Sequence, residues 1–340
     1  MRLRANVVGT SLVAILLLAL PWLLPVTNLN VSLGTTVLLF ALAAASVNIL
    51  LGYTGLLAFG NAAFFGVGAY VSALFAVHVA PNLGLAVAVG SIAGMLSAML
   101  IGPFLVRRRG IYFSLLTLAF GQVYYFIAYR WNDMTGGEDG LTVPRPPLFG
   151  AKGLDDTQYY FLVLAIFLCF MAVLWYVLRS PFGLTLRAIG QNEVRARYLG
   201  ADTNRFVYFA LALSGLFAGT AGALYSMSIN FAYPLLMDWH QSGDFVMMVV
   251  LGGTGTLLGP LLGATIYALG ANVLSTATEA WQIVIGGLFV ACVLLFPRGL
   301  LGLVPSAGRT LPRSLEPDTE PVPVAFAAQT PEPVVQAEER

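Results

Sequence analysis

Long apolar stretches, separated by short polar or glycine-rich connections, dominate the first 300 residues of the chain. A helix needs about 20 apolar residues to cross the hydrocarbon core of a bilayer. By this measure ten segments are predicted membrane spans: residues 7–24, 31–51, 62–79, 83–106, 111–129, 159–178, 206–228, 242–251, 257–274 and 280–296. Segment 242–251 is too short to cross alone. The pattern therefore predicts an all-α polytopic membrane protein with broken or re-entrant helices.

Composition agrees with the hydropathy pattern. The 340 residues are 58% hydrophobic and 10% charged, whereas soluble domains carry about 25% charged residues. The net charge of +1 argues against a nucleic-acid partner, because such proteins neutralise many phosphates. Cys169 and Cys292 lie within apolar runs and have no metal-ligand spacing around them, so the sequence predicts neither a disulfide framework nor a metal site.

The basic residues indicate an orientation in the membrane. With the N-terminus inside and ten crossings, the outer segments hold only Arg130, Arg145 and Lys152, and the inner segments hold the other fourteen of the 17 Lys and Arg residues. Since basic residues favour the cytoplasmic side, both termini are predicted to be cytoplasmic. The transmembrane domain then covers residues 1–304, and the proline-rich stretch 305–340 is predicted to be a disordered cytoplasmic tail.

Two connections are longer than simple turns. The predicted periplasmic loop, 131–158, is rich in Gly and Pro and is interpreted as a docking surface or a cap. The predicted cytoplasmic loop, 180–205, has few helix breakers, and its apolar residues recur between arginines. We expect a short amphipathic helix over 184–199, opened by Ser180 and Pro181 and closed by Gly200.

A glycine-rich pentapeptide occurs twice. L-G-Y-T-G at 51–55 is followed 200 positions later by L-G-G-T-G at 251–255. Each copy ends an apolar run near the predicted inner face. One interpretation is a broken helix of the kind that marks transport sites. The other is an ordinary turn in which glycine supplies a positive φ. Both stay open at this point.

Polar side chains within a span must find a partner or face water, so they are candidates for a substrate pathway. The pathway candidates are Asn48, Thr54, Asn61, Thr117 and Gln122. The alternative is that these groups only join helices. No Asp, Glu, Lys or Arg is expected deep in a span, which argues against coupling to protons or sodium.

The sequence offers no catalytic residues. It contains no P-loop, no H-E-x-x-H and no G-x-S-x-G motif, so neither ATP binding nor an enzyme activity is predicted for the chain itself.

Several short blocks occur in a specific order between residues 46 and 303. They are G-Y-T-G-L-L-A-F-G-N-A-A-F-F-G-V-G-A-Y at 52–70, R-G-I-Y-F at 109–113, T-L-A-F-G at 117–121, T-G-G at 135–137, D-G-L at 139–141, S-P-F-G at 180–183, R-A-I at 187–189, N-E at 192–193, L-G at 199–200, V-L-G-G at 250–253, G-T-L at 255–257 and F-P-R-G-L at 296–300. Together they resemble LivM-type permeases, the membrane subunits of ATP-binding-cassette (ABC) importers for branched-chain amino acids.

The resemblance implies a heteromeric importer in a bacterial inner (plasma) membrane. Its other parts would be a homologous permease subunit of the LivH type, two cytoplasmic ATPase subunits that use ATP and Mg²⁺, and a periplasmic substrate-binding protein. This chain would bind no cofactor. The inner amphipathic helix would be the coupling helix that contacts the ATPases. The residues given this role are Arg187, Ile189, Asn192, Glu193, Arg195, Leu199 and Gly200.

The match to the general importer pattern E-A-A-x-x-x-G is partial, because only Glu193, Ala196 and Gly200 are present, with different spacing. Two other functions stay open. One is an ABC permease for urea or short-chain amides, whose sequences look similar. The other is a secondary carrier or facilitator that works without ATP and would tolerate loss of the coupling surface.

Overall fold

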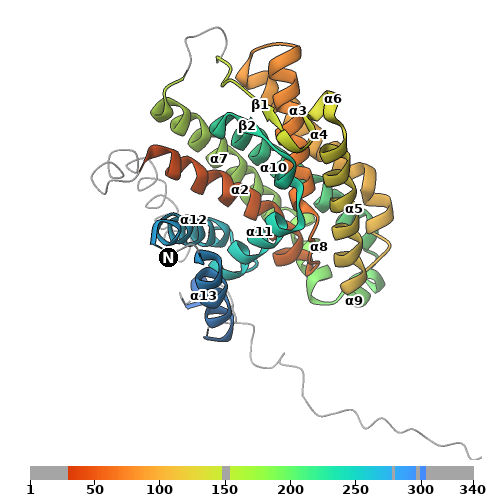
Figure 1. Ribbon diagram of the computed structural model, residues 1–340. Helices are drawn as coiled ribbons and strands as arrows, with labels where there is room; N and C mark the ends of the chain where they lie inside the picture. Colours follow the sequence, from red (N-terminus) through yellow and green to blue (C-terminus); the bar gives the residue numbers. More distant parts are fainter. Residues whose placement is uncertain (1–29, 148–153, 278–279, 296–298, 304–340) are drawn as a thin grey trace, which may run out of the picture. The chain divides into compact units, whose positions relative to one another are not determined.

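The computed structural model describes residues 30–147, 154–277, 280–295 and 299–303. Within these residues, six helices are long and apolar enough to cross a membrane. They are α2 (Val31–Thr54), α3 (Asn61–His78), α4 (Leu83–Leu105), α5 (Ile111–Arg130), α7 (Asp156–Arg179) and α10 (Thr203–Ile229) (Figure 1). The prediction of a polytopic helical membrane protein is confirmed.

The predicted count of ten spans is not confirmed. Segments 242–251, 257–274 and 280–296 correspond to the helices α11 (Trp239–Gly252), α12 (Gly259–Ala277) and α13 (Trp281–Leu295), which do not combine the length and hydropathy of a full span. The 14 residues of α11 cover about 21 Å at 1.5 Å per residue, less than the ~30 Å core of a bilayer. The predicted first span, 7–24, and the tail, 305–340, lie outside the described residues.

Helices α2 and α10 are the most buried of the six and form the centre of this part of the chain. Helix α10 packs most extensively against α4, α3 and α2. Small residues permit this contact: a Cβ atom on Gly94 of α4 would lie only 2.6 Å from the Cα atom of Gly219 in α10. Glycines at such crossings let two backbones approach closely, as is typical of helix pairs in membranes.

A small β-sheet departs from the predicted all-α fold. Strand β1 (Leu141–Thr142) pairs antiparallel with β2 (Phe231–Ala232), with Leu141 opposite Ala232. Helix α6 (Asn132–Thr135) and two 3₁₀ turns, η2 (Gly137–Asp139) and η3 (Pro234–Met237), lie beside the strands in sequence. Asn230 ends α10 in the left-handed conformation, with φ 57°. This conformation turns the chain directly into β2, where extended backbone pairs with β1.

The predicted amphipathic helix is interrupted. Helix α8 (Pro181–Gln191) begins after Ser180, as expected, and α9 (Glu193–Tyr198) follows it. The prediction of one helix over 184–199 is therefore wrong at Asn192. Its side chain accepts a hydrogen bond from the backbone N–H of Arg195 at 2.9 Å, which starts a new helix. Gly200 follows α9 with φ 90°.

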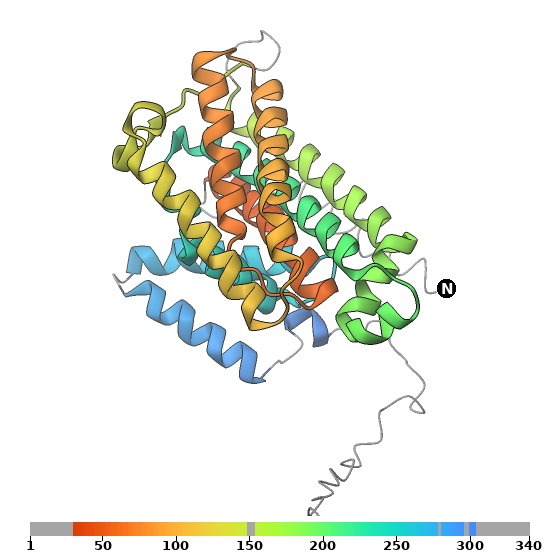
Figure 2. The same cartoon turned by 90° about the vertical axis from the view of Figure 1, so that its right-hand side faces the viewer.

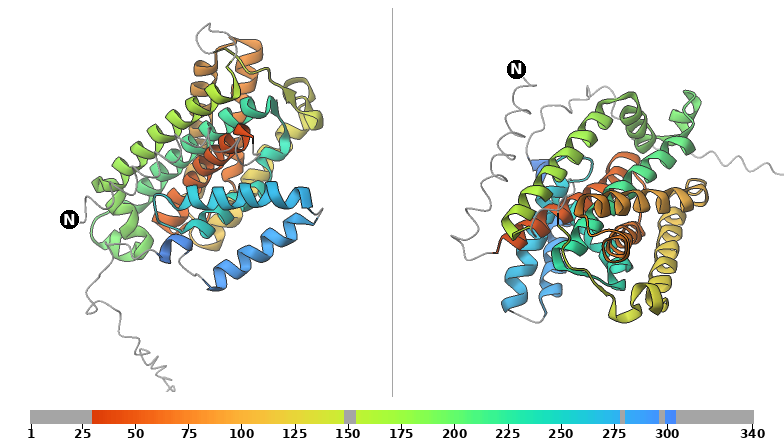
Figure 3. Two further views of the ribbon diagram at one scale, coloured as in Figure 1. Left: turned by 90° about the vertical axis from the view of Figure 1, so that its left-hand side faces the viewer. Right: turned by 90° about the horizontal axis from the view of Figure 1, so that it is seen from above.

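The long helix α10 separates two ends of the bundle. It begins just after α9 and ends just before β2, so α8 and α9 lie at one end and the small sheet at the other (Figure 2). At one side of the bundle, α12 and α13 run next to each other, and α12 packs against α2 and α11 (Figure 3). The candidate functional residues concentrate at the end that carries α8 and α9.

Candidate functional site

The two glycine-rich pentapeptides pack directly against each other. The first copy ends α2 and the second ends α11. Gly55 and Gly255, at the same position of each copy, both have φ 71°. A Cβ atom on Gly52 would lie 2.8 Å from the Cα atom of Gly255. We call residues 51–55 and 251–255 the paired breaks. The positive φ that glycine permits, as the turn interpretation expects, lets two helices end in mutual contact. The transport-site interpretation stays a prediction.

Asn48 joins the paired breaks. Its Nδ2 donates to the carbonyl of Thr256 at 2.8 Å, and its Oδ1 accepts from the N–H of Gly255 at 2.9 Å. Both polar atoms of the buried amide are thus bonded to the second break and the residue that follows it. Thr54 is also buried, and its hydroxyl donates to the Leu50 carbonyl one turn earlier at 2.7 Å. These two candidates make bonds that stabilise the breaks.

Asn61, the first residue of α3, joins three helices. Its Nδ2 donates to the hydroxyls of Ser46 in α2, at 3.1 Å, and Ser214 in α10, at 2.9 Å. The Ser214 hydroxyl in turn donates to the Ser46 carbonyl at 2.8 Å. The Oδ1 atom of Asn61 is buried and has no hydrogen-bond partner among the described residues. The amide is therefore half used, and its acceptor is available to a polar group or a water molecule.

Helix α5 holds the non-helical residues 55–60 that lead from the first break to α3. The Ser114 hydroxyl donates to the Leu57 carbonyl at 2.7 Å, and the Thr117 hydroxyl accepts from the N–H of Phe59 at 3.1 Å. Non-helical backbone at membrane depth needs such partners. Five residues after Thr117 in α5, Gln122 has a buried Nε2 atom without a partner among the described residues. Thr117 is thus engaged in holding this segment, and Gln122 is not.

Helix α8 contacts the first break. Gly190 lies against the end of α2, where a Cβ atom on it would be 2.6 Å from the Tyr53 carbonyl oxygen. Gly55 in turn faces the Gly190 carbonyl, at 3.6 Å from the position of a Cβ atom. The buried residues Leu186 and Ile189 fix the same face of α8 to the bundle. A displacement of α8 would therefore act on the paired breaks without any intervening loop.

An ion-pair network fixes α9. Glu193 accepts from Arg109 Nε at 2.6 Å and from Arg197 Nη2 at 2.9 Å. The Thr203 hydroxyl also donates to Glu193, at 2.9 Å, and Arg109 Nη2 donates to Asn204 Oδ1 at 2.9 Å. Burial of the Glu193 carboxyl disfavours its charge, but the bonds from Arg109 and Thr203 and the two nearby guanidinium charges outweigh this and hold its pKa below its usual value. The network links α9 to the turn before α5 and to the start of α10.

Three large apolar side chains are exposed on α9 and directly after it. Val194, Tyr198 and Leu199 are 63%, 88% and 82% exposed; we call these three residues the α9 patch. Ile189, in contrast, is only 5% exposed and faces the bundle. The remaining coupling candidates of the sequence are exposed as well: Arg187, Asn192, Arg195 and Gly200. Large apolar side chains gathered on an exposed helix are typical of a contact surface for another protein.

The family model for the permease component of branched-chain amino acid transport systems matches residues 30–293, which is more than half of the chain. The chain belongs to this family. The match includes both paired breaks, α8 and α9, so the geometry described above is that of a branched-chain amino acid permease component.

Relatives of this permease include other permease proteins of importers. The high-affinity branched-chain amino acid permease protein LivM of Escherichia coli (strain K12) is 28% identical over 314 residues, covering 85% of this chain and 74% of LivM. LivH of Salmonella typhimurium is 25% identical over 293 residues, covering 80% and 93%. The autoinducer 2 import permease protein LsrC of Klebsiella pneumoniae is 30% identical over 189 residues, covering 52% and 50%. No solved structure matches the chain.

Sequence reasoning missed one ionisable group within the permease. Asp244 of α11 is half-buried and shares a side-chain hydrogen bond with Tyr267 of α12. The expectation that no acidic residue lies deep in a predicted span is wrong at this position. The sequence did place Asp244 within the apolar segment 242–251. Because that segment is too short to cross a membrane alone, Asp244 was not counted as a residue within a span. The pairing of Glu193 with Arg109 was missed for another reason, because Arg109 lies 84 positions away.

Proposed function

We propose that the chain is one of two homologous permease subunits of an ABC importer, and that the importer takes up branched-chain or related amino acids delivered by a periplasmic binding protein. Two cytoplasmic ATPase subunits would supply the energy, and the end that carries α8 and α9 would face the cytoplasm. The family match and the LivM and LivH relatives support this assignment. The observation that carries the mechanism is the contact of Gly190 in α8 with the end of α2.

The contact suggests how ATP hydrolysis would act on the pathway. Helix α8 rests on the first break, and Asn48 joins the first break to the second. If the ATPases move α8 when they close on ATP, both breaks move with it, and the attached helices α2 and α11 tilt. Packed elements switch between discrete arrangements, so a small displacement at α8 becomes an alternation between inward-open and outward-open states.

The pathway itself would pass near the break-to-α3 segment, residues 55–60. Gln122 and Asn61 each carry a buried polar atom without a partner among the described residues. A buried amide atom of this kind costs free energy unless water or substrate satisfies it. Gln122 and Asn61 are therefore the best pathway candidates of the original five, whereas Asn48, Thr54 and Thr117 hold the backbone.

Replacing Asn61 with leucine tests its role. The change removes the donor shared by Ser46 and Ser214, so we expect roughly 1–3 kcal/mol of destabilisation and impaired uptake, with the ATPases still bound. Uptake of labelled leucine by cells that lack their own system, together with ATPase copurification, measures both effects. Asn272→Leu is the matched control, because Asn272 is exposed on α12. Normal uptake by Asn61→Leu would leave Asn61 with a packing role only.

Removing the apolar side chains of the α9 patch tests ATPase docking. We expect Tyr198→Ser with Leu199→Ser to reduce copurification of the ATPases by about tenfold or more, since burial of each large apolar side chain contributes about 1.5–3 kcal/mol. Insertion into the membrane should be unchanged. The control is Met134→Ser with Leu235→Ser, which removes two exposed apolar side chains from α6 and η3. Equal ATPase recovery from both double variants would argue against docking at α9.

Purification of the tagged full-length chain in mild detergent tests the assignment as a whole. Two P-loop ATPases and a second polytopic subunit among the copurifying proteins would support the importer. A chain that purifies alone and still moves solute in liposomes would instead be an ATP-independent carrier or facilitator. Competition of labelled leucine with valine, isoleucine, urea and acetamide would then separate an amino-acid permease from a urea or amide permease.

A further inference from the structure

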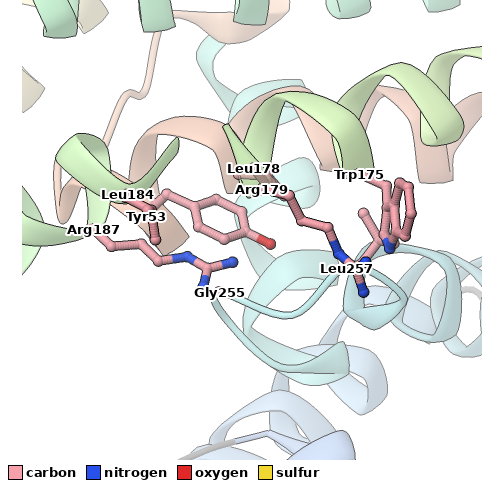
Figure 4. A pocket seen from close by; sticks show the side chains of 8 residues that line it. All are labelled: Tyr53, Trp175, Leu178, Arg179, Leu184, Arg187, Gly255 and Leu257. Atoms are coloured by element: carbon pink, nitrogen blue, oxygen red, sulfur yellow. The ribbon is translucent and has the colours of Figure 1, made fainter. Parts of the chain in front are cut away.

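A pocket of about 410 Å³ lies at the end of the bundle that carries α8, beside the paired breaks. The end of α2, the end of α7, helix α8 and the α11–α12 connection form its walls. The residues that line it are Tyr53, Trp175, Leu178, Arg179, Leu184, Arg187, Gly255 and Leu257. Figure 4 shows the guanidinium groups of Arg179 and Arg187 within this pocket, with the Tyr53 ring between the two side chains.

The two arginines concentrate positive charge in the pocket. Within the part of the chain that the structure describes, the ion pairs involve other basic residues, and neither Arg179 nor Arg187 has a carboxylate partner. Each lies over an aromatic ring instead: Arg179 Cζ is 3.9 Å from the Trp175 ring centre, and Arg187 Cζ is 5.5 Å from that of Tyr53. A ring orients a guanidinium group without neutralising its charge. The pocket therefore complements an anion, and two guanidinium groups suit a phosphate in particular.

The surroundings of the pocket are apolar. Leu184 and Leu257 line it, and the adjoining part of α7 presents the exposed side chains Leu168 and Tyr176. Since α7 is a candidate membrane span, this face is suited to hydrocarbon. Trp175 lies near the end of the span, where tryptophan typically marks the headgroup region of the membrane. A ligand with a phosphate and long apolar chains would match both the charged pocket and the apolar face, whereas a soluble phosphate would use only the first.

We propose that this pocket binds the phosphate of an anionic phospholipid of the inner leaflet, with the acyl chains along α7. Basic pockets between membrane helices are a known way to hold such headgroups. The bound lipid would bridge α7, α8 and the connection after the second break. It would thus stabilise α8 in its contact with α2, and the lipid composition of the membrane would influence the coupling surface.

The test titrates lipids into the full-length chain, purified in mild detergent with its copurifying subunits, and follows bound lipid by native mass spectrometry. Phosphatidylglycerol and phosphatidylcholine with identical acyl chains are compared. We expect preferential binding of phosphatidylglycerol. Arg179→Gln with Arg187→Gln should raise its apparent Kd about thirtyfold, because each basic side chain near the surface favours anionic lipid about fivefold. Equal affinity for both lipids would overturn the proposal.

Two further double variants test whether the pocket itself, and not the net charge of the chain, selects the lipid. Arg107→Gln with Arg195→Gln removes the same charge from exposed positions outside the pocket and should leave the Kd within about twofold. An effect as large as that of the pocket variant would mean that net charge, not the pocket, selects the lipid, and would overturn the site. Arg179→Lys with Arg187→Lys keeps the charge but removes the planar groups that stack on Trp175 and Tyr53, so we expect a Kd between those of the unchanged chain and the glutamine variant. Its binding also shows whether the fold tolerates changes at these positions.

Competition with a soluble compound distinguishes a lipid phosphate from a soluble phosphate as the ligand of the pocket. Glycerophosphoglycerol carries the phosphodiester headgroup without acyl chains, and we expect it not to compete at concentrations that match saturating phosphatidylglycerol. Effective competition would assign the pocket to a soluble phosphate compound and overturn the lipid assignment. Because the experiment measures lipid binding alone, its outcome is independent of the transport function proposed above.

Discussion

Gly52→Ala is expected to reduce uptake at least tenfold, because the added side chain forces the paired breaks apart. The new Cβ atom would lie 2.8 Å from the Gly255 Cα atom, and the Asn48 amide that joins the breaks also borders this position. Neither the backbone of Gly255 nor the bonded amide can move aside as a flexible side chain would. Overpacking of this kind costs typically 1–3 kcal/mol and sometimes more.

The effect is measured by labelled-leucine uptake together with the melting temperature of the purified chain. Gly243→Ala is the matched control, because a Cβ atom on Gly243 of α11 would meet nothing within 4 Å. We expect this control to transport normally. If Gly52→Ala melts and transports like Gly243→Ala, the contact between the breaks is unimportant for function and the proposed coupling route fails.

Glu193→Arg should cut transport strongly while leaving membrane insertion intact. The substitution places a third guanidinium group beside Arg109 and Arg197, in a site where the Glu193 and Arg109 side chains are only 21% and 26% exposed. We expect the free energy of unfolding to fall by about 2 kcal/mol, a value between those for exposed and buried ion pairs. Helix α9 and its exposed patch would lose their position, so copurification of the ATPases should also fall.

The charge-swapped double variant, Arg109→Glu with Glu193→Arg, provides the control. It restores opposite charges across the 2.6 Å pair and should recover part of the transport. Normal transport by the single variant, or a loss that the double variant does not reduce at all, would argue that this ion pair does not position α9.

The pKa of Glu193 adds a pH dependence to this prediction. Because the folded chain holds this pKa below its ordinary value, the carboxylate contributes stability above ~4.3, the usual pKa of glutamate, and loses it as the pH falls through the lowered value. The difference in melting temperature between the chain and Glu193→Gln should therefore be constant near neutral pH and shrink in acid.

Part of this permease was predictable because the relevant signals are local. The apolar runs that became α2, α3, α4, α5, α7 and α10 follow from hydropathy alone, since a membrane span needs only length and apolar composition. The start of α8 at Ser180 and Pro181 likewise depends on neighbouring residues. The interruption of the helix at Asn192 also has a local cause, because asparagine before Glu193 is a typical N-cap residue. The prediction gave more weight to the apolar periodicity of 184–199.

The roles of the polar residues were not predictable in the same way. Sequence identified Asn48, Asn61 and Gln122 as equivalent candidates, because polarity within a span is all that it shows. Their partners differ: Asn48 is bonded through both amide atoms, Asn61 through one, and Gln122 has a buried atom without a partner among the described residues. Similarly, burial separates Ile189, which seats α8, from Leu199, which is exposed on α9.

The sequence by itself determined the family, the helical membrane character and the position of the two glycine-rich pentapeptides along the chain. Only the tertiary structure decided that these pentapeptides touch, that Gly190 rests on the first, and that Arg109 pairs with Glu193. The physical reason is the range of the interactions. Hydropathy and helix capping act within a few residues of the chain, whereas the hydrogen bond from Gly255 to Asn48 spans 207 positions and depends on how the helices between them pack.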